Sequence, residues 1–399
     1  MSLPIVYLFP GFDLVSFMVG FVNFYALYLA ISISLNLEFG YAGIPNFGKV
    51  LFIAGGAAFS GSISGRLASY VLNIGSHQDF IVFSTRIVNQ IDGVLAHDPV
   101  FAVELFIISV MIGALIGALF GYLASYPAIR LREDYLGMLL LGMAQFFQVV
   151  MRTFTPLTGG SQNIAVPDPY FYWISLGTGW RDLVAGLVMS ALAILVFIYA
   201  ERVAKSPLGR MLKAVRESED AARALGKDDA VVRRNVLIVA SAISGIIGAV
   251  FTMYIASVEY DTWNRVAWTF WPFLIVIIGG VGNNYGVALG AAFFSFVLKG
   301  LEQIQPVLQP YVFFDANWLQ YLLFAVLLIT ILMLRPEGII KEKSAPTLPK
   351  KTLGALVAGQ GDPPPSGGAK VQQARTEGRA SRIRRLFELG RRTSPIADG

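Results

Sequence analysis

Side chains that could do chemistry are scarce in this sequence, and most of them lie in one stretch, residues 201–234. Ser206 followed by Pro207 is a typical helix start, and Gly226 is a typical helix end. Between them, apolar residues recur at helical spacing: Met211, Leu212, Val215, Ala222 and Leu225. The pattern predicts a short amphipathic helix suited to docking in a groove of another protein. A solvated connector is the alternative that the pattern leaves open.

One glycine-rich segment has the spacing of a nucleotide-binding loop. Gly43, Gly48 and Lys49 fall where such a loop places its two glycines and its lysine. Val50, however, stands where the loop needs a serine or threonine, and the segment joins two apolar blocks rather than a strand and a soluble helix. We interpret the match as coincidental and expect the Lys49 side chain to extend to the cytoplasmic surface.

A polar face is predicted on residues 135–151 and the residue that follows them. Its members fall on one side of a helix: Leu141, Gln145, Gln148 and Arg152. Polar groups among lipid-spanning helices usually face the interior of the bundle, so this face could line a passage. Structural hydrogen bonds between helices are the alternative reading for the two glutamines.

Several kinds of chemistry are not expected. The chain has no cysteine, which excludes disulfides, thiolate metal sites and cysteine nucleophiles. His77 and His97 share a polar loop without acidic or thiol companions, so we expect no metal site and no cofactor. No ordered set of acid, base and nucleophile is evident, and we therefore expect no enzyme.

The elements that must position these residues are long apolar blocks. Of the 399 residues, 55% are hydrophobic and 14% are charged, whereas soluble domains carry about 25% charged residues. A helix crosses the hydrocarbon layer with about 20 apolar residues. The blocks are residues 14–35, 50–72, 101–126, 135–151, 183–199, 236–258, 270–298 and 318–334. The sequence therefore predicts an all-α integral membrane protein, a polytopic helical bundle of about 8–9 transmembrane segments.

Glycine-rich breaks interrupt the bundle near residues 40–48 and 279–286. The second break divides 270–298 into two passes or into a re-entrant hairpin that turns near Asn283 and Asn284, and it either forms part of a gate or permits close packing. The basic segments are 128–134, 201–234 and the C-terminal tail. Basic loops favour the cytoplasmic side, which places the N-terminus outside and predicts nine crossings, two of them short.

The C-terminal residues 341–399 differ in composition from the rest of the chain. Residues 363–368 are proline, serine and glycine, which cannot bury apolar surface. Residues 379–392 predict either a basic amphipathic helix on an anionic membrane or a solvated charged tail. We expect residues 1–340 to form the transmembrane domain and residues 341–399 to form a largely disordered cytoplasmic tail.

Residues 209–226, which read GRMLKAVRESEDAARALG, are similar to the coupling loop of ABC importer permeases. Further segments match these permeases in the same order: 35–43, 131–142, 157–163, 278–292 and 334–338. The chain thus resembles the branched-chain amino acid permeases of the LivM type over about residues 30–340. It departs from them at residues 47–50, where the family often has histidine and small residues, and this leaves the identity of the solute open.

The resemblance implies a permease subunit of an ATP-driven importer in the cell membrane of a prokaryote, without an ATPase of its own. It implies ABC ATPase subunits, a sister permease of the LivH type and an extracellular substrate-binding protein as partners, and no nucleic acid. The solute would be a branched-chain or another amino acid. A urea or short-amide permease of the same superfamily and a stand-alone secondary transporter are the alternatives; the latter tends to carry midspan charge, which the apolar blocks largely lack.

The resemblance also implies two sets of site residues. Docking to the ATPase would be carried by Gly209, Arg210, Ala214, Arg216, Glu217, Ala221, Ala222, Leu225 and Gly226. The translocation pathway would include Gly40, Gly43, Asn46, Gln145, Gln148, Gly159, Gly160, Gly279, Gly280 and Gly282.

Overall fold

The computed structural model describes residues 14–75, 78–131, 133–224, 226, 228–311, 315–316, 318–335 and 337–342. His77, Leu225 and the expected tail from Lys343 onward lie outside these residues. The described part is all-α apart from one pair of two-residue strands. The predicted fold class is confirmed.

The helices follow the apolar blocks closely. They are α2 (Leu14–Leu35), the π-helix η1 (Asn36–Tyr41), α3 (Lys49–Val71), α4 (Ser84–Leu95), α5 (Pro99–Arg130), α6 (Glu133–Thr153), α7 (Thr155–Thr158), α8 (Thr178–Lys205), α9 (Pro207–Glu217), α10 (Glu219–Ala224), α11 (Asp229–Ile255), the π-helix η4 (Val266–Phe270), α12 (Trp271–Gly279), α13 (Asn284–Leu308) and α14 (Trp318–Leu334). Short 3-10 turns are η2 (Gly160–Gln162), η3 (Phe171–Leu176) and η5 (Gln309–Tyr311), and the strands are β1 (Ile164–Ala165) and β2 (Ser257–Val258).

Seven of the helices in the described part are long and apolar enough to cross a membrane: those within Leu14–Tyr41, Lys49–Val71, Pro99–Ala128, Tyr135–Thr153, Gly179–Lys205, Asp229–Ile255 and Asn284–Pro306. Two shorter apolar helices cover Val266–Gly279 and Trp318–Leu334. The chain turns between α12 and α13 at residues 280–283, so the apolar block 270–298 is divided where the glycines predicted a break.

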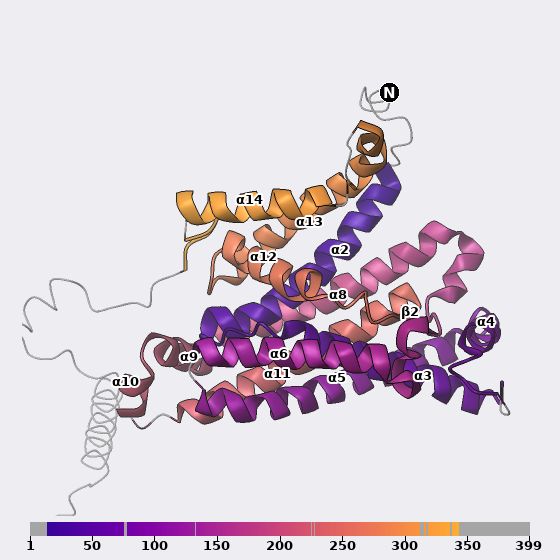
Figure 1. The fold of residues 1–399 in the computed structure, drawn as a ribbon, viewed down its shortest axis with the longest axis horizontal. Coiled ribbons are helices and arrows are strands. Elements are labelled where there is room, and N and C mark those ends of the chain that lie inside the picture. Colours follow the sequence, from indigo (N-terminus) through magenta and orange to yellow (C-terminus); the bar gives the residue numbers. More distant parts are fainter. Residues whose placement is uncertain are drawn as a thin grey trace, which may run out of the picture. The chain divides into compact units, whose positions relative to one another are not determined.

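Small residues bring α3, α5 and α11 together, and these helices run side by side with α6 (Figure 1). On α5, Gly113 and Gly117 face Gly245 of α11 so closely that a Cβ on Gly245 would lie 2.1 Å from the Gly113 carbonyl oxygen. Close backbone approach through residues spaced four apart is a common way to join helices in lipid, where hydrophobicity does not drive association.

Aromatic side chains fill the contacts among α2, α12, α13 and α14. The ring of Phe294 lies 4.4 Å from that of Phe324, 5.2 Å from that of Tyr28 and 5.5 Å from that of Trp271, measured between ring centroids. Rings at these separations add to the energy of simple area burial. The cluster fixes the two short apolar helices against the longer ones.

Two elements differ from the sequence-based expectation. The apolar block 101–126 stops before Pro127, but α5 continues through this proline to Arg130. A proline near the C-terminal end removes one backbone donor without displacing the remaining turn. The polar loop 76–99 contains the amphipathic helix α4, whose apolar side, with Ile87, Ile91 and Leu95, is buried.

Candidate functional site

The expected coupling segment forms two helices rather than one. Ser206 caps α9, its hydroxyl accepting from the Gly209 amide at 3.3 Å, and Pro207 occupies the first helical position. The helix ends at Glu217, because Ser218 takes an extended conformation and its hydroxyl accepts from the Ala221 amide at the start of α10. The expected single helix over residues 207–226 is therefore wrong, since a serine that can cap a new helix interrupts it.

The residues of the coupling segment divide between an outer and an inner face. Arg210, Ala214 and Glu217 are exposed at helical spacing on α9, and Ala221 is exposed on α10. Gly209 and Ala222 are buried, as are Leu212 and Val215. Gly226 is exposed and has φ +73°, the left-handed region that favours glycine. We call Arg210, Ala214 and Glu217 the outer face of α9.

The two glycine-rich breaks meet at the end of the bundle that carries α9. The side-chain oxygen of Asn36 in η1 accepts from the Gly282 amide at 3.0 Å, and its side-chain nitrogen donates to Asn284 at 2.9 Å. Asn284 in turn donates to Glu201 near the end of α8, at 3.1 Å. These hydrogen bonds thus connect η1, the turn between α12 and α13 with the start of α13, and the end of α8, which leads into α9.

Arg216 joins α9 directly to the first break. Its guanidinium donates to the carbonyl oxygen of Gly40, and its side chain covers Gly43. Gly43 has φ +70°, and a Cβ there would lie 2.9 Å from the Arg216 Cγ. Gly40 and Gly43 therefore allow α9 to pack closely against the first break. The sequence predicts both glycines as pathway residues, and it contains no local signal of their contact with α9.

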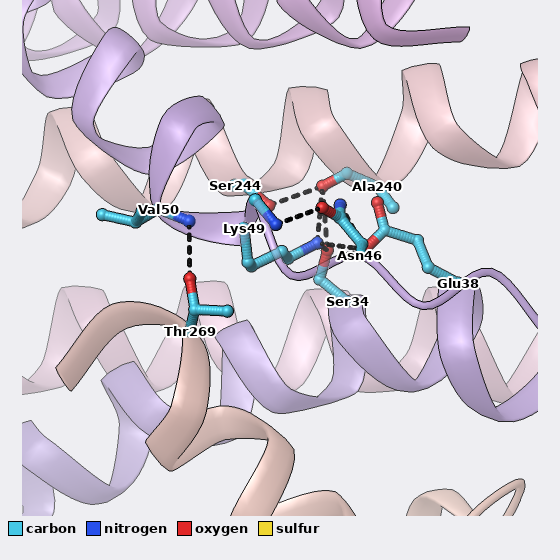
Figure 2. Close-up of polar contacts among 9 residues, drawn as sticks. Ser34, Glu38, Asn46, Lys49, Val50, Ala240, Ser244 and Thr269 are labelled. Atoms are coloured by element: carbon cyan, nitrogen blue, oxygen red, sulfur yellow. Dashed lines mark hydrogen bonds and ion pairs between the residues drawn. The ribbon is translucent and has the colours of Figure 1, made fainter. Parts of the chain in front are cut away.

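A buried ion pair joins Glu38, which precedes this break, to Lys49, which follows it (Figure 2). The Lys49 ammonium group lies 2.8 Å from Glu38 Oε2 and 2.9 Å from Ser34 Oγ, and Asn46 donates to the same carboxylate oxygen at 3.1 Å. Neither charged side chain is exposed. The expectation that Lys49 reaches the surface is therefore wrong. Its partner Glu38 lies in the π-helix η1, and the sequence does not indicate the wider turn of this helix.

The remaining pathway candidates do not join this cluster. Gln145 and Gln148 are half-buried on α6, and Arg152 lies at its end with its guanidinium 5.6 Å from the Tyr260 ring. Gly159 and Gly160, with φ +73° and +66°, form the turn after α7 near β1 and β2. Figure 1 places β2 and α4 at one end of the bundle and α9 at the other. The candidates thus lie at both ends, with the glutamines of α6 between them.

A second charged cluster lies at the end opposite α9. Arg181 donates through Nε to Asp168 at 2.5 Å and through Nη2 to the Tyr254 carbonyl at 2.6 Å. The Asp168 amide donates to Asp92 of α4 at 2.9 Å. Burial raises the pKa of the Asp92 carboxyl to about 7 and also raises the pKa of Asp168, although Arg181 opposes the latter shift. No local pattern in the sequence indicates this cluster, because its members lie in α4, in α8 and in the loop before η3.

Metal chemistry finds no support in the part of the chain that the structure describes, where no group of three or more His, Asp or Glu side chains could hold an ion. His97 lies with Nδ1 3.0 Å from the Gly93 carbonyl oxygen.

The long apolar helices of the described part define a polytopic helical membrane protein. The chain belongs to the family described as branched-chain amino acid transport system / permease component, whose sequence model matches residues 17–332. It is accordingly a multi-pass protein of the cell membrane, as the resemblance predicted.

Two relatives show how far the similarity extends. The probable branched-chain amino acid transport permease protein LivM of Methanocaldococcus jannaschii is 36% identical over 330 residues, which are 82% of this chain and 94% of the relative. The high-affinity branched-chain amino acid transport system permease protein LivM of Escherichia coli is 25% identical over 236 residues, 54% of this chain and 52% of that protein.

Proposed function

We propose that this permease subunit moves branched-chain amino acids into the cell, using ATP hydrolysed by separate ABC ATPase subunits. The observation that carries the proposal is the placement of α9, which exposes Arg210, Ala214 and Glu217 on one face while Arg216 contacts the Gly40 carbonyl on the other. A partner that displaced the outer face would move the first glycine break with it. The substrate class follows the printed names of the relatives, which do not favour the urea or secondary-transporter alternatives.

The surroundings of Lys49 support the absence of a built-in motor. A nucleotide-binding loop needs its lysine free to reach phosphates and a hydroxyl residue after it. Here the ammonium group is fully buried on Glu38, and Val50 follows it. The segment Gly43–Lys49 therefore supports the view that the energy comes from other subunits.

The proposed assembly has four kinds of component. This chain and a sister permease of the LivH type would enclose the pathway, and an extracellular binding protein would deliver the solute. Of the two ATPase subunits, one would dock on α9 and α10 of this chain. We assign the pathway to the glycine breaks around Gly40 and Gly282, the Gln145 and Gln148 face of α6, and the turn at Gly159 and Gly160.

Reconstitution of the four components in proteoliposomes tests this function. We expect uptake of labelled leucine, isoleucine or valine that requires ATP inside and the binding protein outside, with no competition from urea. Because the chain has no cysteine, a single Arg210→Cys reports the side on which α9 lies. Uptake by this chain without any ATPase, or labelling of Cys at position 210 from outside the cell, contradicts the proposal.

A further inference from the structure

Residues 337–342, which follow α14, return to the second glycine break. The Ile339 amide donates to the Ile278 carbonyl at 2.8 Å, and the Ile340 amide donates to the Gly279 carbonyl at 3.0 Å. Asn283 adds a hydrogen bond from its side chain to the Lys341 carbonyl at 3.1 Å. The segment 337–342 is thus bound to the turn between α12 and α13 by backbone and side chain.

Glu342 ends this segment with its carboxylate between two cations of α9. Its Oε1 lies 2.7 Å from the Lys213 ammonium group, and its Oε2 lies 2.8 Å from the Arg216 guanidinium. All three side chains are about one quarter exposed, at 22–26%. Ion pairs that are partly shielded from water and share one carboxylate hold their geometry better than isolated surface pairs.

The same two cations also contact the first glycine break. Arg216 donates to the Gly40 carbonyl, and the Lys213 ammonium group lies 5.4 Å from the centroid of the Tyr41 ring in η1. The second break has room for the carboxylate because Gly282 lacks a side chain: a Cβ there would lie 2.9 Å from the Glu342 carboxyl carbon. Glu342 therefore stands where α9, η1 and the turn at Gly282 meet.

We propose that Glu342 is a positioning residue for transport, which ties α9 to the second glycine break, so that displacement of α9 moves both breaks together. The proposal rests on the coupling role of α9 given above. With Glu342 in place, the turn at Gly282 follows α9; without it, Arg216 still contacts Gly40, and the turn at Gly282 loses its ionic link to α9. Loss of this link uncouples ATP hydrolysis from solute movement.

The test is Glu342→Gln in the complete complex with its ATPase subunits, in proteoliposomes. The matched control is Glu337→Gln, in the same segment, which removes an ion pair with Lys341 whose side chains are 66% and 59% exposed. We expect Glu342→Gln to lower solute uptake by about fivefold, because the neutral amide forms no ion pair with Lys213 or with Arg216. ATP hydrolysis should stay within about twofold of the parent, so that the solute moved per ATP falls. Glu337→Gln should change neither quantity.

A double substitution shows whether Lys213 and Glu342 act through the same contact or independently of each other. Lys213→Gln with Glu342→Gln should lower uptake by less than the product of the two single effects, because both changes break the same contact. Normal uptake by Glu342→Gln, a proportional fall in hydrolysis and uptake, or loss of the ATPase subunits from the complex would each overturn the proposal. If the parent complex moves solute without ATP, the coupling role itself fails, and that result is seen before any variant is compared.

Discussion

The ammonium nitrogen of Lys49 lies 2.8 Å from the carboxylate of Glu38, and neither side chain is exposed to solvent. Removing one partner of a buried pair leaves an uncompensated charge and costs about 3–5 kcal/mol. We therefore expect Lys49→Met to lower the thermal unfolding temperature of the purified protein in detergent by several degrees. The double variant Glu38→Leu with Lys49→Met should recover most of the loss, since no buried charge remains.

Lys341→Gln is the control for this experiment, because its pair with Glu337 is exposed. An exposed pair contributes about 0–1 kcal/mol to stability, so the unfolding temperature of Lys341→Gln should match that of the parent. A double variant as unstable as Lys49→Met would contradict the view that the unpaired charge causes the loss.

Glu217 tests the outer face of α9. It is exposed and ends α9, so Glu217→Arg should leave insertion and stability unchanged. We expect uptake by the complex to fall by about tenfold or more, the effect of losing a central interface contact. Asp220→Ala, exposed on α10 and separated from the outer face of α9 by the break at Ser218, should transport normally. Equal uptake by the parent and Glu217→Arg would remove this residue from the docking surface.

Substitutions at Gly226 test whether transport depends on the backbone conformation at this position, independently of side-chain packing. Its φ of +73° disfavours residues with a Cβ, and nothing lies within 4 Å of a Cβ built there. Asparagine tolerates this conformation better than β-branched residues do. We expect Gly226→Asn to keep uptake within about twofold and Gly226→Val to lower it by about fivefold or more, at equal expression. Equal uptake by both variants would show that the backbone conformation at this position does not matter.

Gly245 tests the close contact between α5 and α11. A Cβ at this position would lie 2.1 Å from the Gly113 carbonyl oxygen and 2.9 Å from the Gly117 Cα, so Gly245→Ala must push the helices apart. Overpacking of this kind costs about 1–3 kcal/mol. Gly300→Ala on α13, with open space around its Cβ, is the matched control and should not lower the unfolding temperature. A stable Gly245→Ala protein would contradict the packing argument.

Asp92 predicts a pH dependence of stability. Burial raises the pKa of its carboxyl to about 7 from a usual value near 3.8, so the folded protein holds a proton that the unfolded chain loses. Stability from this group is therefore present at low pH and is lost as pH rises between these two values. Asp92→Asn keeps an oxygen that can accept from the Asp168 amide. We expect it to raise the unfolding temperature above pH 7 by about 2–4 °C, the shift that about 1 kcal/mol produces in a large domain.

The comparison with the parent must be made at two pH values. Near pH 4 the parent and Asp92→Asn should unfold at similar temperatures, because the carboxyl is then protonated in the folded state. A difference of the same size at both pH values would show that the effect does not come from titration of Asp92.

The sequence predicted the elements well where composition alone decides them. The last apolar block, residues 318–334, matches α14 residue for residue, and Ser206 caps α9 as its position before Pro207 indicated. Such features depend on neighbours along the chain. The break at Ser218 was missed because a serine inside a helical pattern can either face solvent or start a new helix, and the choice depends on packing.

The site was harder to predict, because its contacts join distant segments. The glycines at 40–43 and 279–282 were found as breaks, yet their meeting through Asn36 and Gly282, 246 residues apart, has no local signal. The pairing of Glu38 with Lys49 was missed for a different reason. An α-helix continued through residue 38 would not have predicted their approach, whereas the π-turn turns Glu38 toward the start of α3.

A single extended residue, Ser206, separates the last residue of α8 from the first of α9. A Cβ on Gly209 would lie 2.4 Å from the Ala204 carbonyl oxygen, so the two helix ends are in close contact at this corner. Because only Ser206 joins the two helices, a tilt of α9 is expected to tilt α8 as well. The helix α8 in turn packs along α2. A force applied to α9 would therefore be transmitted along α8 to the opposite end of the bundle, where α8 begins.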